Sequence, residues 1–247
     1  MYSLNPVQAW RSFLALPNET PLKTFGIAFL VALSCSVVVS LTAVGLKPLQ
    51  QENRLRESAS SMVKMVEGLG YGLPQRQYVD RISGDYVSQT SKSHSPLNAD
   101  QDIAGLSQVE DVVTVYEVRT QNRLDLVILP VRGVGYKSMM KGYLALNKDL
   151  STIAGLTFHQ QDESPGMGAR IMDPEWQILW ANKQTTDENG TVQIKVVKGK
   201  AKTSFEVDGI SGATRTGWGV TNLVQFWLGP DGYGPYLERL KREDDGS

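Results

Sequence analysis

The residues best suited to chemistry in this sequence form a small-residue turn at 208–216. The turn reads Asp-Gly-Ile-Ser-Gly-Ala-Thr-Arg-Thr, so it offers three hydroxyl groups beside two glycines and an alanine. Apolar residues then recur at helical spacing, which predicts a helix ending at Gly229-Pro230: they are Val220, Leu223, Val224 and Trp227. A tight turn at a helix N-terminus presents backbone N–H groups and the positive end of the helix dipole. Residues 211–216 therefore predict a phosphate site, with an ordinary Ser/Gly turn as the alternative.

Composition excludes several other kinds of site. The chain has 247 residues, 41% of them hydrophobic, which suffices for one domain, or for a domain plus an anchor. A net charge of −1 gives no electrostatic basis for nucleic-acid binding. One cysteine, Cys35, cannot form an internal disulfide, and two distant histidines do not suggest zinc. We expect no metal site and no independent catalytic site.

A membrane-spanning helix is predicted at 24–46, where an uncharged apolar run lies between Lys23 and Lys47. At about 1.5 Å per residue it is roughly 35 Å long, enough to cross the hydrocarbon core. A signal peptide is a poorer interpretation, because the leading segment 1–23 is long and no Ala-x-Ala cleavage site follows. The Lys and Arg count near the helix ends mildly favours a cytoplasmic position for the C-terminal side.

Periodicity divides the rest of the chain. A region at 47–110 is predicted to hold an amphipathic helix (51–67) and a polar, partly irregular insertion. The apolar side of that helix carries Leu55, Ala59, Met62, Val63 and Val66. Strand patterns are found in the domain expected at 111–240, near 113–118, 124–131, 143–146, 151–159 and 192–196. A short helix is expected from Asp173 as N-cap and Pro174 to about Ala181, and a charged, frayed tail at 241–247.

A Gly-x-Gly at Gly133 and Gly135 invites a dinucleotide interpretation. The third glycine of that fingerprint and the surrounding βαβ unit are missing, so we do not expect this chain to bind NADH.

The turn also carries a family resemblance. Ser-Gly-Ala-Thr-x-Thr, here 211–216, resembles the flavinylation motif of the C subunit of the sodium-translocating NADH:quinone reductase, which the G subunit of the related Rnf complex shares. The resemblance implies that Thr216 carries FMN through a phosphoester bond made by a flavin transferase that uses FAD. Asp208 and Gly209 also fit the pattern that this transferase recognises. The membrane segment around 35–50 resembles that of the reductase's C subunit more than that of the Rnf subunit.

Two further segments resemble loops of the same family. Glu-Ser-Pro-Gly-Met-Gly at 163–168 is similar to a loop that lies alongside the isoalloxazine ring, with Ser164 and Met167 where Thr and Leu are usual. The loop around Tyr136 is similar too, although many relatives have Trp where Lys137 stands. The cofactor-binding residues so implied are Thr216, Asp208, Ser211, Gly212, Ala213, Thr214, Glu163, Ser164, Met167 and Tyr136. The phosphate is expected among the N–H groups of 211–216, with the Ser211 and Thr214 hydroxyls as further donors.

The resemblance implies an α+β protein, with one N-terminal transmembrane helix followed by an FMN-binding domain whose mostly antiparallel sheet is flanked by helices. It implies electron relay between an iron–sulfur centre and the flavin of a neighbouring subunit, during quinone reduction coupled to sodium export. NADH and quinone would bind to other subunits. The bulk of the chain would lie on the periplasmic side of the inner membrane, against the charge count. The alternatives are the G subunit of an Rnf complex, which is usually shorter, and a non-redox membrane-anchored binding module.

Overall fold

The computed structural model describes residues 10–11, 13–15, 17–18, 20–89, 91, 93–121 and 123–245. The chain divides into two compact units, Met1–Leu55 and Arg56–Ser247. The N-terminal segment expected at 1–23 and the tail expected at 241–247 lie partly outside the described residues.

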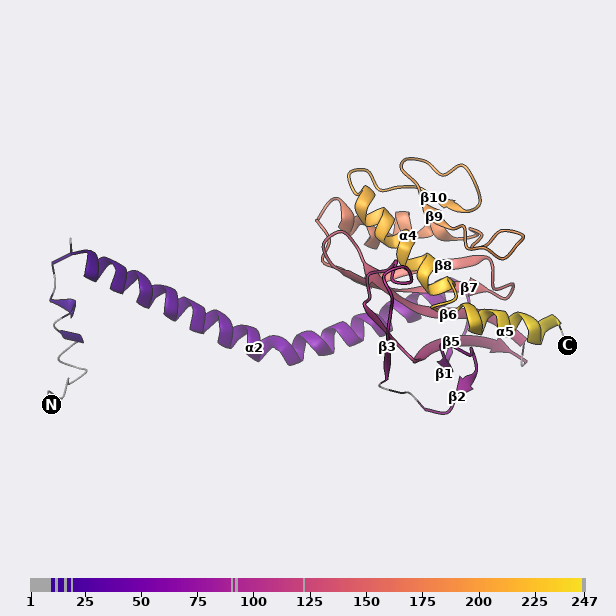
Figure 1. Ribbon diagram of the computed structural model, residues 1–247, viewed down its shortest axis with the longest axis horizontal. Helices are drawn as coiled ribbons and strands as arrows, with labels where there is room; N and C mark the ends of the chain where they lie inside the picture. The colour runs from indigo at the N-terminus through magenta and orange to yellow at the C-terminus, as the bar shows by residue number, and fades with distance from the viewer. Residues whose placement is uncertain are drawn as a thin grey trace. The chain divides into compact units, whose positions relative to one another are not determined.

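One long helix, α2 (Pro21–Gly68), contains the apolar run at 24–46 (Figure 1). Its most apolar window has a mean hydropathy of 2.5 and is not buried, so the helix is long and apolar enough to cross a membrane. The sequence predicted two helices, at 24–46 and 51–67, whereas α2 is one helix that continues through Pro48. A proline removes one backbone hydrogen bond, which can kink a helix without ending it.

A six-stranded sheet forms the centre of the second unit. Its strands are β1 (Gln75–Asp80), β2 (Tyr86–Val87), β5 (Val112–Thr120), β6 (Arg123–Val134), β7 (Met139–Asn147) and β8 (Ile153–Gln160). They pair antiparallel in the order β2-β1-β5-β6-β7-β8, which confirms the predicted fold class and four predicted strands. The assignment of 75–110 to an irregular insertion was wrong for β1, which pairs with β5 along its whole length. Because only Val79 in β1 is fully buried, the strand lacks an alternating apolar signal.

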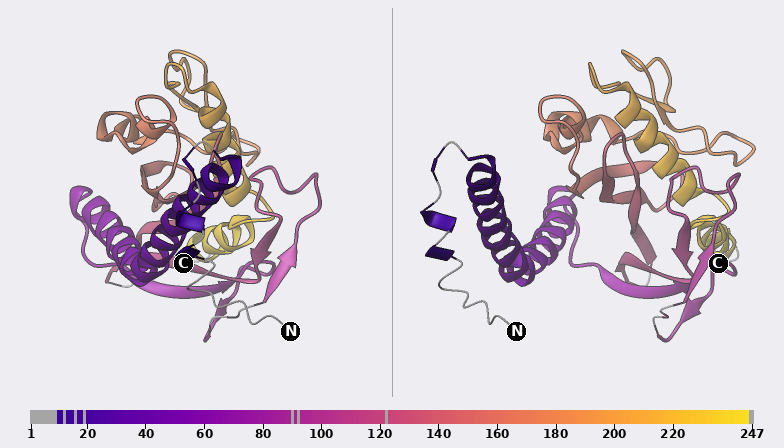
Figure 2. Two further views of the ribbon diagram at one scale, coloured as in Figure 1. Left: turned by 90° about the vertical axis from the view of Figure 1, so that its left-hand side faces the viewer. Right: turned by 60° about the vertical axis from the view of Figure 1, so that its left-hand side comes forward.

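The two faces of this sheet are covered by different helices. Helix α4 (Thr214–Leu228) lies across one face of the sheet (Figure 2), and the larger apolar cluster contains residues of both. On the other face, Met62 and Val66 from the end of α2 pack against β-strand residues such as Ile128. The predicted amphipathic side of that helix was therefore correct at its C-terminal half only, since Leu55 is 73% exposed and Ala59 is also exposed.

Helix α4 has the apolar face that its spacing predicts. Its four predicted core residues are all buried, and Trp227 Nε1 donates a hydrogen bond to the carbonyl of Arg132 at 2.7 Å. A Cβ at Gly133 would lie 2.9 Å from Leu223 Cβ, and one at Gly219 would lie 2.7 Å from the carbonyl of Val134. Gly133 and Gly219 thus allow the close approach of α4 to β6.

Short elements complete the unit. They are β3 (His94–Pro96), β4 (Gln108–Glu110), η1 (Gly168–Met172), α3 (Pro174–Gln177), η2 (Ile178–Trp180), β9 (Lys195–Val196), β10 (Glu206–Val207) and α5 (Gly234–Asp245). The helix expected from Pro174 to Ala181 is one α-helical turn followed by a 3-10 turn, and the Asp173 carboxylate bonds to Arg170 Nε instead of acting as a cap. The strand expected at 192–196 is reduced to β9, which pairs parallel with β10. Helix α5 continues to Asp245, past the start of the expected frayed tail.

Candidate functional site

The segments that resemble family motifs meet at one cavity of about 320 Å³. Eight of the ten predicted site residues line it: Tyr136, Glu163, Ser164, Met167, Gly212, Ala213, Thr214 and Thr216. Gly168 and Arg215 line it as well and were not predicted. The sheet brings these segments together, because the loop after β6, the segment after β8 and the start of α4 lie at the same end of the domain.

Glu163 is the buried acidic residue of this cavity, with 5% of its surface exposed. Its Oε1 atom accepts hydrogen bonds from the backbone N–H groups of Lys137 at 2.8 Å and Ser138 at 3.0 Å. The Ser138 hydroxyl donates a longer bond of 3.3 Å to the same oxygen. The loop between β6 and β7 therefore fixes the position of Oε1. The other carboxylate oxygen, Oε2, points to a different partner.

The second oxygen of Glu163 binds the hydroxyl of Thr216. Thr216 Oγ1 donates to Oε2 at 2.8 Å, and Thr216 is only 2% exposed. Helical threonines often bond to the backbone carbonyl of the preceding turn, as Thr221 does with Gly217 at 3.0 Å. Thr216 differs, since its hydroxyl bridges α4 and the segment after β8.

The pKa of Glu163 lies below its ordinary value of 4.5. Burial raises this pKa. The hydrogen bonds from the Lys137 N–H, the Thr216 hydroxyl and the Ser138 N–H together lower it by more than burial raises it. The carboxylate is thus ionised at neutral pH and accepts a hydrogen bond from Thr216 as an anion.

Two glycines make room for this arrangement. A Cβ at Gly168 would lie 2.6 Å from Thr216 Oγ1 and 2.8 Å from Glu163 Oε2. A Cβ at Gly135 would lie 2.6 Å from Glu163 Oε1. Gly168 is the last residue of the Glu-Ser-Pro-Gly-Met-Gly segment, and its place in that segment was the available signal. The sequence alone does not reveal its contact with Thr216.

The N-terminus of α4 is open to an anion. Ala213 occupies the N-cap position, so no side chain caps the helix in this described segment. Gly212 before it has φ +76°, a left-handed conformation that glycine adopts without strain. The N–H groups of the first turn have no acceptor within the helix, and they carry the positive end of its dipole. The predicted tight turn at a helix N-terminus is therefore present, and its use as a phosphate site stays a prediction.

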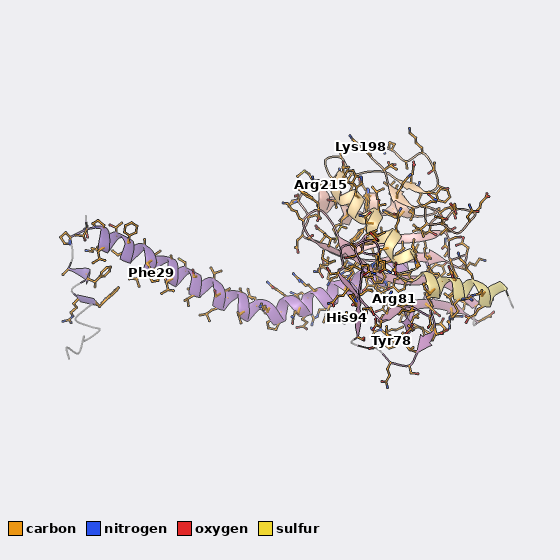
Figure 3. All side chains as sticks on the ribbon, viewed as in Figure 1. Phe29, Tyr78, Arg81, His94, Lys198 and Arg215 are labelled. Atoms are coloured by element: carbon orange, nitrogen blue, oxygen red, sulfur yellow. The ribbon has the colours of Figure 1, made fainter. Side chains whose placement is uncertain are left out.

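Arg215 adds a positive charge at the rim. Its guanidinium lies 5.1 Å from the centre of the Tyr136 ring, a cation–π contact. Tyr136 is 53% exposed and Met167 is 46% exposed, so an aromatic ring and a thioether lie open beside the cavity. Figure 3 labels Arg215 at the end of the domain where α4 begins, far from Tyr78 in β1. Sequence reasoning missed Arg215 because it occupies the variable position between the two threonines.

Asp208 and Ser211 lie apart from that cavity. The Asp208 carboxylate accepts hydrogen bonds from the Ala201 N–H at 2.8 Å and Lys200 Nζ at 2.6 Å, and these bonds lower its pKa. Its carbonyl accepts a bond from Trp176 Nε1 at 2.8 Å. Ser211 lines a neighbouring cavity of about 280 Å³, together with Lys198. The contact of either residue with a cofactor stays a prediction.

Comparisons with known proteins place the chain in a family. Residues 135–229 match the model of the FMN-binding domain family. The C subunit of the Na(+)-translocating NADH-quinone reductase from Pseudomonas aeruginosa is 37% identical, over 91% of this chain and 98% of that protein. The same subunit from Vibrio parahaemolyticus is 34% identical, over 92% and 98%. The crystal structure of Shewanella oneidensis NqrC aligns with a TM-score of 0.69 at 27% identity, covering 78% of this chain and 99% of that one. The chain therefore belongs to the family of C subunits of the Na(+)-translocating NADH-quinone reductase.

Proposed function

We propose that this chain is a membrane-anchored flavoprotein subunit that carries FMN covalently on Thr216. In this proposal it relays electrons between an iron–sulfur centre and the flavin of a neighbouring subunit, within a reductase that couples quinone reduction to sodium export. Membership of the C-subunit family supports the complex, and the matched FMN-binding domain supports the cofactor. The first observation counts against the Rnf subunit, and the second counts against a non-redox binding module.

The observation that carries the choice of Thr216 is its bond to Glu163. Three hydroxyls lie within the turn, and those of Ser211 and Thr214 belong to exposed residues. If exposure alone decided which hydroxyl carries FMN, Ser211 and Thr214 would be favoured over Thr216. Thr216 is instead buried at the cavity, with its hydroxyl held by an ionised carboxylate at 2.8 Å. A hydroxyl so oriented is the better nucleophile toward phosphorus, because its proton already points to an acceptor.

The residues present fit FMN. The uncapped N–H groups of α4 and the Arg215 guanidinium suit its phosphate, while Tyr136 and Met167 offer apolar surface to a flat ring. FMN supplies the redox chemistry when bound, and the protein positions and tunes it. An ester link would keep the cofactor on a domain that cannot take up a replacement. A flavin transferase that uses FAD would make that link, and NADH and quinone would bind to other subunits.

Mass spectrometry of the chain from its native host tests the attachment. We expect the intact mass to exceed the sequence mass by FMN less one water, with the addition mapped to Thr216. Thr216→Ala should carry no covalent flavin, whereas Thr214→Ala should retain some. Covalent FMN on Thr216→Ala would refute the assignment, and a colourless wild-type chain coexpressed with the transferase would favour a non-redox module.

We also propose that residues 47–247 lie outside the cytoplasm, on the periplasmic side of the inner membrane. Family membership supports this orientation, although the Lys and Arg count leans the other way. Alkaline phosphatase fused after Ser247 should be active, and a cytoplasmic reporter at the same place inactive. The reverse pair of results would contradict the orientation.

The membrane segment is proposed to pack against helices of the other subunits. It carries small residues that permit close helix approach: Gly26, Ala28, Ser34, Ser36, Ser40 and Ala43. The hydroxyls of Ser34 and Ser36 bond to carbonyls of their own helix, so neither requires a polar partner in the bilayer. Scrambling 24–46 at constant hydrophobicity should impair assembly of the complex. Normal assembly would show that the helix is a lipid-facing anchor.

A further inference from the structure

We propose that Glu163 is the base that takes the proton of Thr216 during flavin attachment, so that the acceptor chain supplies part of its own modification chemistry. This inference rests on the proposed function, because it assumes that Thr216 is the acceptor. It makes Glu163 a catalytic residue for maturation of the chain, whereas the family resemblance gave it only a place beside the ring.

The geometry gives Glu163 the position of a general base. Oε2 lies 2.8 Å from Thr216 Oγ1, within the range over which a side chain abstracts a proton. Oε1 is held by the Lys137 and Ser138 N–H groups, so the carboxylate has a fixed orientation. Its three donors keep it ionised, which is the form that accepts a proton. The exposed hydroxyls of Ser211 and Thr214 have no carboxylate contact among the hydrogen bonds of the described residues, which distinguishes Thr216 from both.

Two glycines leave space around the Glu163 carboxylate and the Thr216 hydroxyl. Gly168 and Gly135 have no side chain where a Cβ would meet the Glu163 carboxylate, and in the case of Gly168 also the Thr216 hydroxyl. Here both reacting groups line the same cavity, so a phosphate group that enters it can reach the hydroxyl while the carboxylate is in contact with it.

The chemical step is a transfer of the flavin-side phosphoryl group. Thr216 Oγ attacks the phosphorus on the flavin side of the FAD pyrophosphate, and its O–H proton passes to Glu163 Oε2. The new bond joins Oγ to that phosphorus, and the pyrophosphate P–O bond breaks to release AMP. No oxidant or reductant is needed. The products are the phosphodiester, AMP and a neutral Glu163, which then loses its proton to solvent.

The test uses the full-length, unmodified chain in detergent with purified flavin transferase and FAD. Initial rates of FMN addition, followed by intact mass at several chain concentrations, give kcat and KM for the acceptor. Glu163→Gln keeps the side chain's size and should lower kcat about 100-fold or more, since general bases contribute roughly 10²–10⁴-fold. KM should stay within about threefold. Glu175→Gln, the same change at an exposed residue of α3, should match the wild type.

A kcat for Glu163→Gln within about threefold of the wild type overturns the proposal, and so does a raised KM with unchanged kcat, which would indicate recognition. If Glu163→Gln does not fold, Gly168→Ala decides, because its methyl group separates the two reacting groups while leaving the carboxylate charge in place. A folded Gly168→Ala chain modified at the wild-type rate overturns the proposal. A wild-type chain that gains no FMN on Thr216 refutes the proposed function instead, whatever the Glu163 variants do.

Discussion

Gly168 lies directly against the hydroxyl of Thr216, so closely that a Cβ there would stand 2.6 Å from Oγ1. The same Cβ would stand 2.8 Å from Glu163 Oε2. The backbone at Gly168 is not in the left-handed region, so glycine is needed at this position for space and not for conformation. The hydrogen bond between Glu163 and Thr216 therefore requires a residue without a side chain at position 168, in η1.

Gly168→Ala should destabilise the unmodified chain by about 1–3 kcal/mol, the usual cost of overpacking a tight site. The added methyl group must displace Thr216 or Glu163, both buried. Urea unfolding of the second unit within the full chain measures the loss. Gly155→Ala is the matched control, because its Cβ would lie 3.9 Å from Met65, an ordinary contact. Equal stability of the two variants would mean that the site adapts without strain.

Arg215→Glu should slow covalent FMN incorporation about tenfold, because it replaces a cation at the cavity rim with an anion facing a phosphate. The effect should shrink in high salt, since Arg215 is an exposed residue and its charge is screened. Incorporation rates at low and high ionic strength measure this. Arg123→Glu, the same charge reversal at the start of β6, should have little effect. A salt-independent loss for Arg215→Glu would indicate that the side chain acts through its contact with Tyr136.

Much of this architecture could be predicted from the sequence, for identifiable physical reasons. Strongly periodic segments were reliable: the four apolar residues of α4 are all buried, and the alternation of Val113 and Val115 does mark a strand. Strand β1 was missed because its residues are mostly polar, and its pairing with β5 depends on backbone hydrogen bonds that no side-chain pattern encodes. Local signals determine local structure, whereas a mostly polar strand such as β1 depends on the strands that pair with it.

The sequence likewise predicted part of the candidate site and missed part of it. Family motifs predicted eight of the residues that line the cavity, but not the bond between Glu163 and Thr216, which are far apart in sequence. Asp208 was predicted from motif spacing alone, and the structure shows its carboxylate bound within the loop that precedes α4. Spacing in a motif reflects what a modifying enzyme recognises as well as what a cofactor contacts, and the sequence does not separate the two.

His159 should make the stability of the second unit depend on pH. Burial, with Lys141 nearby, lowers its pKa from 6.5 to about 4, so the unfolded chain binds more protons between these values. Stability should therefore fall as pH decreases from 6.5 towards 4, by at most about 3 kcal/mol from this residue. Urea unfolding at pH 7.5 and pH 5 measures the change, and His159→Gln should make it smaller. An unchanged pH dependence in that variant would show that the imidazole takes up its proton in the folded state.

Flavin attachment should raise the pKa of Glu163. In the unmodified chain this pKa is below 4.5, so the carboxylate contributes stability above that pH, and the contribution is lost as pH falls through the folded-state value. An ester at Thr216 removes the hydroxyl donor that now binds Oε2 and places a phosphodiester anion in the same cavity. Both changes favour the protonated acid and bring the pKa closer to its value in the unfolded chain, so Glu163 should contribute less to the loss of stability on acidification. Acid unfolding of the modified and unmodified full-length chains measures the shift, with Glu163→Gln mixed with FMN as the control for non-covalent effects. Coincident acid transitions for the two wild-type forms would mean that the Glu163 carboxylate turns away from Thr216 once the ester is formed.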